Sequence, residues 1–350
     1  MTGRERILAA LDRRVPDRIP TCEWVLNPGV MEKICGVRDD MAFVAAMDMD
    51  GIAVGLDSKN EKLDGRHVRD EWGITRVTYD EYPNPVGHPI KDMRDFESYS
   101  PPEPLAPYRF DRIKKALGVF GEEKCVIARV RDVFSQPRDL MGYENFLMSF
   151  YEDPDLAGAL MAMSADYSVK ICDGLAELGI EVIVVGDDIA NNGSLLLSPA
   201  MYREYVYPHF ARLVGHAKKL GLRVIKHSDG DLRAVVEDLV ESGIDCLDPI
   251  DERGNMFMDR LKAEYGGRIA FKGNVDCVET LVSKPVAAVR AETARCMLKG
   301  GIGGGLIISS SNSIHSGVSP LNYRAFLDAV KEFGNYPLDI PQLEKIAAAA

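Results

Sequence analysis

The chain has 350 residues, of which 46% are hydrophobic and 27% charged, and its formal net charge is −12. These values are typical of a soluble globular protein, and the negative balance argues against a surface that binds nucleic acid through its phosphates. No apolar run is long enough to span a bilayer, and the N-terminus lacks the apolar core of a signal peptide. We therefore expect a cytoplasmic protein that binds neither nucleic acid nor membrane. The seven cysteines form no CxxC pair and no zinc-finger spacing.

Short apolar runs alternate with segments of helical periodicity along most of the chain. Apolar residues recur at helical spacing in 201–220, 232–239 and 286–298, for example. The alternation is typical of parallel strands joined by helices. The runs expected to be strands are 19–23, 51–54, 125–130, 181–185, 223–226, 245–249, 268–273 and 305–309. Eight such units predict an α/β fold of the TIM barrel type, a (β/α)8 barrel.

Two stretches interrupt this alternation. Residues 57–108 are charged, aromatic and rich in proline, and we expect a β-ribbon and an extended loop inserted after the second strand. Residues 135–180 hold two successive helical patterns, the second of which begins behind a cap at Asp153. We expect one barrel domain over 1–340, with 57–108 as a decoration, and a frayed tail over 341–350.

Polar and ionisable residues follow nearly every predicted strand. In a barrel the loops after the strands carry the active site, so these residues are candidates for chemistry. His227 and Asp229 follow the fifth strand with one residue between them, which lets both side chains project into one cavity. The other candidates at this end are Glu23, Trp24, Arg131, Asp187, Asp188, Asn274, Asn312 and His315.

Several of these candidates also have a structural interpretation. Asp187 and Asp188 are adjacent on a strand end, so at most one faces the cavity, and the other can cap the next segment. Arg131 either forms a structural ion pair or holds an anionic substrate. Asn274 either contacts substrate or closes a turn, and His315 is a lid residue, a ligand or plain surface.

Five segments in the same order resemble the uroporphyrinogen decarboxylase superfamily. They read RERILAALDRRVPDRIP, GDDIANNGSLLLSPAMYREYVYPHFARLV, HSDGDL, FKGNVDC and GGGLIISSSNSIHSGVSPLNYRAF. The resemblance extends over essentially the whole chain and implies a (β/α)8 barrel and a homodimer. It also implies one of two activities, either decarboxylation of the acetate arms of uroporphyrinogen or zinc-assisted methyl transfer with a corrinoid protein.

The sequence departs from both kinds of family member. Decarboxylases carry an arginine-rich segment after the first strand, whereas residues 23–30 read EWVLNPGV, and Glu23 would repel a polyanionic tetrapyrrole. Thiol-activating methyltransferases bind zinc through a His-x-Cys pair and a later cysteine, whereas residues 227–229 and 309–311 read HSD and SSS. The chain is therefore more similar to the O-demethylase methyltransferase branch.

That branch implies a zinc site of nitrogen and oxygen ligands. The candidate metal ligands are His227, Asp188, Asp229 and Glu204, and the candidate catalytic residues are His227, Asp187, Asp188 and Asp229. Zinc would act as a Lewis acid on a small methylated molecule, and a methoxy compound is the substrate that we expect. Because no D-x-H-x-x-G cobalamin motif is present, the corrinoid would come on a separate protein.

Two other functions are compatible with the sequence. One is a decarboxylase of the uroporphyrinogen type, in which Asp187 or His227 protonates the carbanion that remains after loss of CO2. The other is a non-catalytic tetrapyrrole- or corrinoid-binding protein, since a fold does not guarantee activity.

Overall fold

A seven-stranded parallel sheet forms the centre of the protein. The computed structural model describes residues 1–78, 83–186 and 188–349. The strands follow one another in chain order and are β1 (Gly51–Gly55), β6 (Cys125–Arg131), β7 (Val182–Gly186), β8 (Arg223–His227), β9 (Cys246–Asp248), β10 (Ala270–Val275) and β11 (Leu306–Ser310). Seven of the eight predicted strands are thus present as a curled parallel sheet.

The remaining predicted strand, 19–23, is not a regular strand. Thr21 forms a single parallel bridge with Ile308 of β11, whose amide donates to the carbonyl of Pro20 at 2.9 Å. The Thr21 carbonyl also accepts hydrogen bonds from the amides of Asp50 and Gly51 at 3.0 and 3.1 Å. Pro20 has no amide proton to add to a ladder. The segment therefore touches both edge strands, β11 and β1, through a few hydrogen bonds.

Alternate residues of the strands face two apolar layers, as the two-residue period of a strand requires. On the inner face, Ile127, Val184 and Ile225 pack with Ile7 and Leu11 of helix α1 (Gly3–Leu11). The α1 backbone also bonds the loop just before β6, because the amide of residue 4 donates to the carbonyl of residue 123. Helix α1 thus covers the inner face at the amino ends of the strands, and the carboxyl ends are left for polar groups.

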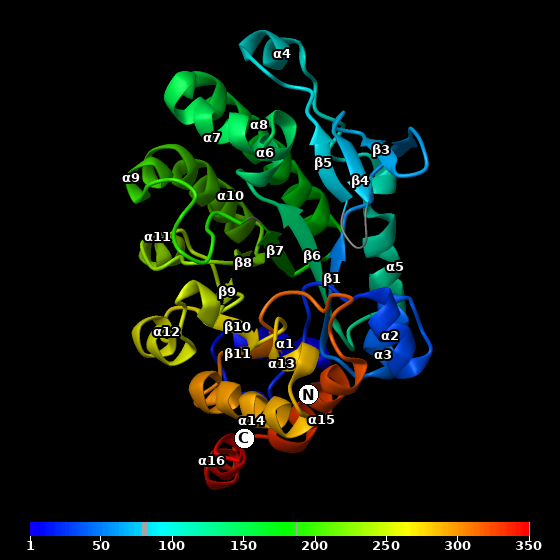
Figure 1. Ribbon diagram of the computed structural model, residues 1–350, viewed down its shortest axis with the longest axis vertical. Helices are drawn as coiled ribbons and strands as arrows, with labels where there is room; N and C mark the ends of the chain where they lie inside the picture. The colour runs from blue at the N-terminus through cyan, green and yellow to red at the C-terminus, as the bar shows by residue number, and fades with distance from the viewer. Residues whose placement is uncertain (79–82, 187, 350) are drawn as a thin grey trace.

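Helices cover the outer face of the sheet and surround it in Figure 1. Val126, Val185 and Val224 belong to the main apolar core together with Leu160 of α8 and Phe210 of α10. The α-helices besides α1 are α2 (Pro28–Cys35), α3 (Asp40–Ala46), α4 (Met93–Ser98), α5 (Asp111–Phe120), α6 (Ser135–Met141), α7 (Tyr143–Glu152), α8 (Pro154–Glu177), α9 (Pro199–Met201), α10 (Tyr207–Lys219), α11 (Val236–Glu241), α12 (Met258–Tyr265), α13 (Thr280–Ser283), α14 (Val286–Cys296), α15 (Pro320–Phe333) and α16 (Ile340–Ala347). The short 3-10 or π segments are η1 (Pro107–Phe110), η2 (Tyr202–Val206), η3 (Glu252–Gly254) and η4 (Met297–Gly301).

The region between β1 and α5 contains a second, antiparallel sheet. Its strands are β2 (Asn60–Lys62), β3 (His67–Asp70), β4 (Thr75–Thr78) and β5 (Pro83–Gly87), and α4 follows. Arg76 of β4 ties this sheet to the main body, because its guanidinium donates to Asp139 of α6 at 3.1 Å. This antiparallel sheet thus lies next to the helices that follow β6 (Figure 1).

Several helices differ from the sequence predictions. Residues 135–180 form three helices, α6, α7 and α8, where two were predicted. Gly142, with φ of 89°, separates the first two. The predicted cap at Asp153 is confirmed, since its carboxylate accepts from the amide of Leu156. Helix α11 begins only at residue 236, later than the periodicity from 232 indicated.

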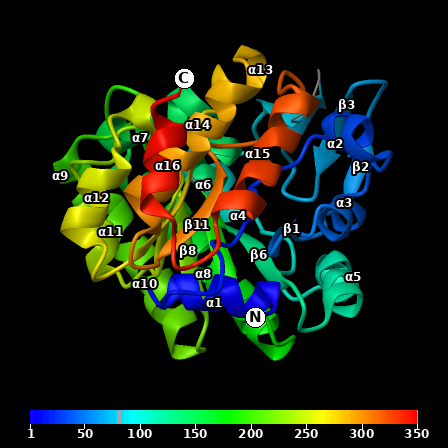
Figure 2. The ribbon, with the colours of Figure 1, turned by 90° about the horizontal axis from the view of Figure 1, so that it is seen from below.

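The C-terminal segment is largely a packed helix. Helix α16 lies beside α14 in both ribbon views (Figures 1 and 2). Leu343 is buried against the core, and the guanidinium of Arg295 donates to the carbonyl of Ala347 at 2.9 Å. Residues that we expected to form a frayed tail therefore add apolar surface to the core.

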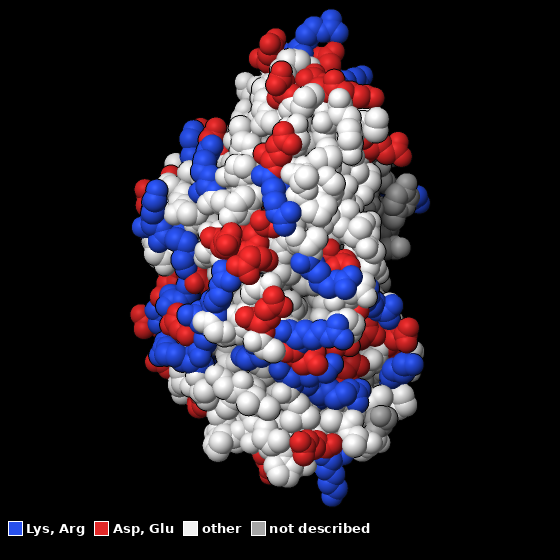
Figure 3. Space-filling view, turned by 90° about the vertical axis from the view of Figure 1, so that its left-hand side faces the viewer, with Lys and Arg blue, Asp and Glu red and all other residues white. Residues whose placement is uncertain are grey.

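Charged side chains of both signs are interspersed on the face formed by α9 to α12. Figure 3 shows acidic and basic groups next to one another on this side, so its surface carries no large patch of one charge. Among the helices that the structure describes, none is long and apolar enough to cross a bilayer.

Candidate functional site

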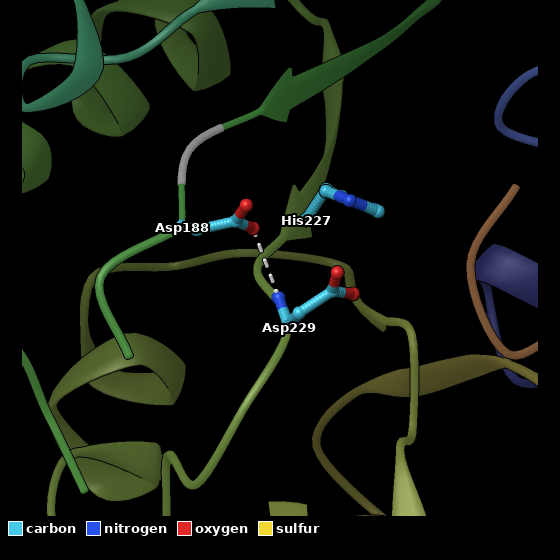
Figure 4. A group of neighbouring side chains, drawn as sticks. All are labelled: Asp188, His227 and Asp229. Atoms are coloured by element: carbon cyan, nitrogen blue, oxygen red, sulfur yellow. Dashed lines mark hydrogen bonds between the residues drawn. The ribbon is translucent and has the colours of Figure 1, made fainter. Parts of the chain in front are cut away.

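His227, Asp188 and Asp229 come together at the carboxyl end of the parallel sheet. His227 is the last residue of β8, Asp188 lies two residues after β7, and Asp229 lies two residues after β8. Figure 4 shows the three side chains around one point. One imidazole nitrogen and one oxygen from each carboxylate all lie within 4.8 Å of one another. The spacing allows the three groups to bind a single metal ion.

The backbone fixes this cluster through the strand register. Gly186 of β7 pairs with His227 of β8, and this register brings the two loops that follow side by side. The amide of Asp229 donates to Oδ1 of Asp188 at 3.1 Å, the bond drawn in Figure 4. Gly230 then turns the chain with φ of +89°, and a Cβ there would lie 2.6 Å from the carbonyl oxygen of Asn191. Only glycine fits both the conformation and the close approach.

Buried charges behind His227 hold its ring in place. Nδ1 of His227 lies 2.8 Å from Oδ2 of Asp248, and Nζ of Lys272 donates to Oδ1 of the same carboxylate at 2.8 Å. Burial opposes the ionisation of Asp248, but the Lys272 ammonium and His227 outweigh it and hold the pKa at about 2. An ionised carboxylate only accepts hydrogen bonds, so Nδ1 carries the proton. The Nε2 lone pair of His227 is therefore left for a ligand.

Asp229 has an unsatisfied oxygen inside the cluster. Its Oδ2 accepts a hydrogen bond from Asn312, whereas its Oδ1 is buried and has no hydrogen-bond partner within the described part of the chain. Burial raises the pKa of Asp229 to about 7, against the opposing effect of His227. A buried carboxylate oxygen without a donor is costly, and a bound cation would satisfy it.

Trp24 lies against His227, and Glu23, the residue before it, is buried against β11. The indole of Trp24 stacks on the imidazole with ring centroids 4.1 Å apart and planes 12° apart. It lies so close to Gly186 that a Cβ there would be 2.7 Å from the ring. Glu23 accepts hydrogen bonds from the amide and hydroxyl of Ser310, and burial raises the pKa of its carboxyl to about 7.

Three sequence candidates do not face this cluster. Asn274 is buried against α14, where its Oδ1 accepts a hydrogen bond from the thiol of Cys296 at 2.8 Å. His315 is half-buried, and its Nε2 lies 2.9 Å from the carbonyl of Cys277. Glu204 is exposed on η2, and the metal-binding group found among the described residues does not include it.

Of the two remaining candidates, Arg131 forms an ion pair and Asp187 is not described by the structure. Arg131 is the last residue of β6, and its guanidinium donates to Asp139 at 2.8 Å, so a structural ion pair is present. Asp187 lies outside the described residues. The pairing of Asp248 with Lys272 was not predicted, although a lysine inside an apolar strand was a signal that it needed a buried counter-charge.

A family model for uroporphyrinogen decarboxylase (URO-D) matches residues 71–333 of this chain. The chain belongs to the uroporphyrinogen decarboxylase family. The match includes β6 to β11, and therefore the three residues of the cluster. The family resemblance on which the zinc expectation depends is thus confirmed.

Curated relatives include both kinds of family member. The methylcobamide:CoM methyltransferase MtaA of Methanosarcina barkeri is 23% identical over 317 residues, 86% of this chain and 90% of that protein. A methylated-thiol–coenzyme M methyltransferase of Methanosarcina mazei is 26% identical over 204 residues, 57% of this chain and 51% of that protein. A uroporphyrinogen decarboxylase of Anaeromyxobacter dehalogenans is 23% identical over 335 residues, 92% of this chain and 90% of that protein.

A solved structure of a methyltransferase from Methanosarcina mazei has the same fold. It superimposes with a TM-score of 0.75 and covers 95% of this chain and 99% of its own, at 18% sequence identity. At that identity the likeness establishes the fold and leaves the activity to the residues of the site.

Proposed function

We propose that the chain is a methyltransferase that moves a methyl group from a small methylated compound, such as a methoxy compound, to a corrinoid held by a separate protein. The observation that carries the proposal is the cluster of Asp188, His227 and Asp229 at the carboxyl ends of β7 and β8. Relatives named as methyltransferases that act with a methylcobamide or a methylated thiol support it.

The donor set fits zinc. Catalytic zinc sites have three protein ligands, which can all be nitrogen and oxygen atoms, and keep one position open. His227 offers Nε2, and Asp188 and Asp229 offer carboxylate oxygens, of which Oδ1 of Asp229 is buried without a partner in the described structure. When bound, zinc would act as a Lewis acid that draws electron density from the heteroatom carrying the methyl group.

The chain's own residues prepare the site for this chemistry. Asp248 and Lys272 keep the proton on Nδ1 of His227, so that Nε2 stays available. Asn312 orients Asp229 through a hydrogen bond to Oδ2. Trp24 covers one face of the imidazole and excludes water from it. Asp187 stays a candidate for a further carboxylate at this site.

The segment 19–23 lies between the two edge strands of the parallel sheet. We infer that residues 19–23 take the place of an eighth strand and close the sheet into a (β/α)8 barrel, with the antiparallel sheet of β2 to β5 as its insertion. The contacts of Pro20 and Thr21 with both edge strands support this closure. Closure would bring Glu23 and Trp24 into the ring of strand ends.

A decarboxylase of the uroporphyrinogen type is the second candidate. The similarity to the decarboxylase of Anaeromyxobacter dehalogenans over 92% of this chain favours it. The segment EWVLNPGV at 23–30 argues against it, because it offers no arginine to the substrate's carboxylates and places a buried acid there. Incubation with uroporphyrinogen, followed by chromatography for coproporphyrinogen, separates the two functions.

Metal analysis tests the zinc site. We expect protein dialysed against a weak chelator to keep about one zinc per chain, and His227→Ala to keep almost none. His216→Ala is the matched control, because His216 pairs with Asp173 on the surface of α10 and should leave the zinc content unchanged. Equal zinc content in the wild type and His227→Ala, or none in either, would refute the zinc site.

A further inference from the structure

A cavity of about 670 Å³ lies between the inserted antiparallel sheet and the carboxyl end of β6. Three arginines line it from three elements, Arg76 of β4, Arg131 at the end of β6 and Arg138 of α6. All three approach one buried carboxylate, that of Asp139, at 3.1, 2.8 and 3.6 Å. The single negative charge of Asp139 is therefore shared by three guanidinium groups.

Two of these guanidinium groups retain most of their hydrogen-bonding capacity. Each has five N–H donors in a planar fork that suits a carboxylate. In the described structure the Arg131 side chain donates one hydrogen bond, to Asp139, and the Arg138 side chain donates none. Arg76 is more fully used, because it also donates to Asp70 at 2.7 Å. The cavity wall thus presents cationic donors that no described residue occupies, the chemistry that binds an anion.

The sheet register places this wall beside the metal cluster. Arg131 pairs with Gly186, and Gly186 pairs with His227, so the three residues form one row across β6, β7 and β8. The backbones of Arg131 and His227, at the two ends of the row, are two strand spacings apart, which is about 10 Å. Arg131 is four residues from Ile127 on β6, and His227 is two residues from Ile225 on β8, so both share the inner face with these apolar residues.

No side chain of β7 stands between Arg131 and His227 in this row. Gly186 occupies that position, and the indole of Trp24 lies against it, as the 2.7 Å from a Cβ at Gly186 to the ring shows. The indole also stacks on His227. An apolar surface therefore extends from His227 toward the arginine end of the row.

We propose that Arg131 and Arg138 form a subsite for the carboxylate of the methyl donor. The donor's methylated heteroatom would lie at the cluster of Asp188, His227 and Asp229, at the other end of the row. The separation of about 10 Å is that of the two backbones, and the side chains that reach in from each end leave a shorter distance for the donor to span. This inference rests on the proposed function and specifies its substrate class, a small methylated carboxylate. The phosphate of a corrinoid shares this chemistry, and the test below separates the two ligands.

Binding of matched acids and amides tests the subsite without any corrinoid. The probes are 4-methoxybenzoate and 4-methoxyphenylacetate, each compared with its neutral amide, and calorimetry on zinc-loaded protein gives the Kd values. We expect at least one acid to bind the wild type at least tenfold more tightly than its amide. Arg131→Gln and Arg138→Gln should each remove that preference, and Arg138→Lys should restore part of it.

Arg203→Gln is the control. Arg203 is an exposed arginine of the π segment η2, it is paired with Asp238, and it does not line the cavity. It should keep the preference for the acid. The proposal is overturned if neither acid binds more tightly than its amide, or if the preference survives in both glutamine variants. Loss of affinity for the corrinoid protein in those variants, without any preference for the acids, would assign the arginines to the corrinoid instead.

The zinc content separates this proposal from the proposed function. The arginine variants should retain the wild-type zinc content, because neither arginine contacts Asp188, His227 or Asp229. If the metal site is wrong but the subsite is right, the acids still bind preferentially while His227→Ala leaves the zinc content unchanged. If the subsite alone is wrong, zinc depends on His227 and the acids show no preference.

Discussion

At the scale of single residues, the site depends on charges that never reach solvent. Asp248 is 1% exposed and Lys272 is 4% exposed, and together they decide which imidazole nitrogen of His227 carries its proton. Removing one partner of such a pair leaves the other charge buried and uncompensated, which costs about 3–5 kcal/mol. The pair thus links the stability of the fold to the chemistry of the cluster.

Asp248→Asn should lower the free energy of unfolding by about 3 kcal/mol, since Lys272 loses its counter-charge. Zinc affinity should fall about 10- to 100-fold, because the hydrogen bond that orients His227 is weakened. Urea unfolding and competition with a chelator measure the two effects. In the double variant with Lys272→Met the stability should recover while the zinc affinity stays low. Recovery of both would contradict a role for Asp248 in orienting the imidazole.

Glu23 should make the stability of the fold depend on pH. Its carboxyl has a pKa of about 7 when folded and 4.5 in its ordinary state, so the folded chain binds this proton more tightly. Stability should therefore fall as pH rises from 4.5 to 7, by up to about 3 kcal/mol from this group. Glu23→Gln cannot ionise. At pH 5 we expect this variant to unfold at nearly the same urea concentration as the wild type, and at pH 8 we expect it to unfold at a higher urea concentration. The same difference between the two proteins at pH 5 and pH 8 would contradict this.

At the scale of elements, the strand ends decide where side chains meet. The parallel strands could be predicted because strands buried on both faces appear as continuous apolar runs, such as 182–185. His227 and Asp229 could be placed in the site because strand periodicity is local. The pairing of Asp248 with Lys272 could not, because it depends on the register between β9 and β10. The hydrogen bond from Cys296 to Asn274 could not be predicted either, because it joins β10 to α14, 22 residues further along the chain.

Gly186 at the end of β7 should be essential for the stacking of Trp24 on His227. In Gly186→Ala the new Cβ would lie 2.7 Å from the indole, so the ring must move, and we expect a loss of about 1–3 kcal/mol in stability. The fluorescence of Trp24 should change, which Trp72→Phe in the same background isolates. Gly158→Ala on α8 is the control, because a Cβ there meets nothing within 4 Å. Unchanged fluorescence in Gly186→Ala would contradict the close contact.

At the scale of the whole molecule, the ends of the chain complete the structure around the sheet. Helix α1 covers the amino ends of the strands from inside, and α16 packs on α14. The sequence could not show the second contact, because a short alanine-rich end has the same composition whether it is frayed or packed. Leu343 is 1% exposed, and this single buried side chain makes the difference.

Removal of residues 340–350 should therefore destabilise the protein. Burial of a leucine side chain contributes about 1.5–3 kcal/mol, and we expect a lower Tm in calorimetry. Glu344→Ala is the control, since Glu344 is exposed on the same helix. The zinc content of the truncated chain should remain that of the wild type, because α16 contributes nothing to the cluster of Asp188, His227 and Asp229. A Tm equal to that of the full chain would show that α16 does not stabilise the fold.

The methyl transfer to a corrinoid that we propose depends on the cluster of Asp188, His227 and Asp229. Its most direct test mixes the zinc-loaded protein with a Co(I) corrinoid protein and follows the absorbance change to methyl-Co(III). The donors are 4-methoxybenzoate, methoxyacetate, methanol and methylamine, and zinc-free protein and His227→Ala are run beside the wild type. We predict methylation by the zinc-loaded wild type with at least one donor and none by the other two proteins. No methylation with any donor, or equal rates in all three proteins, would contradict the account.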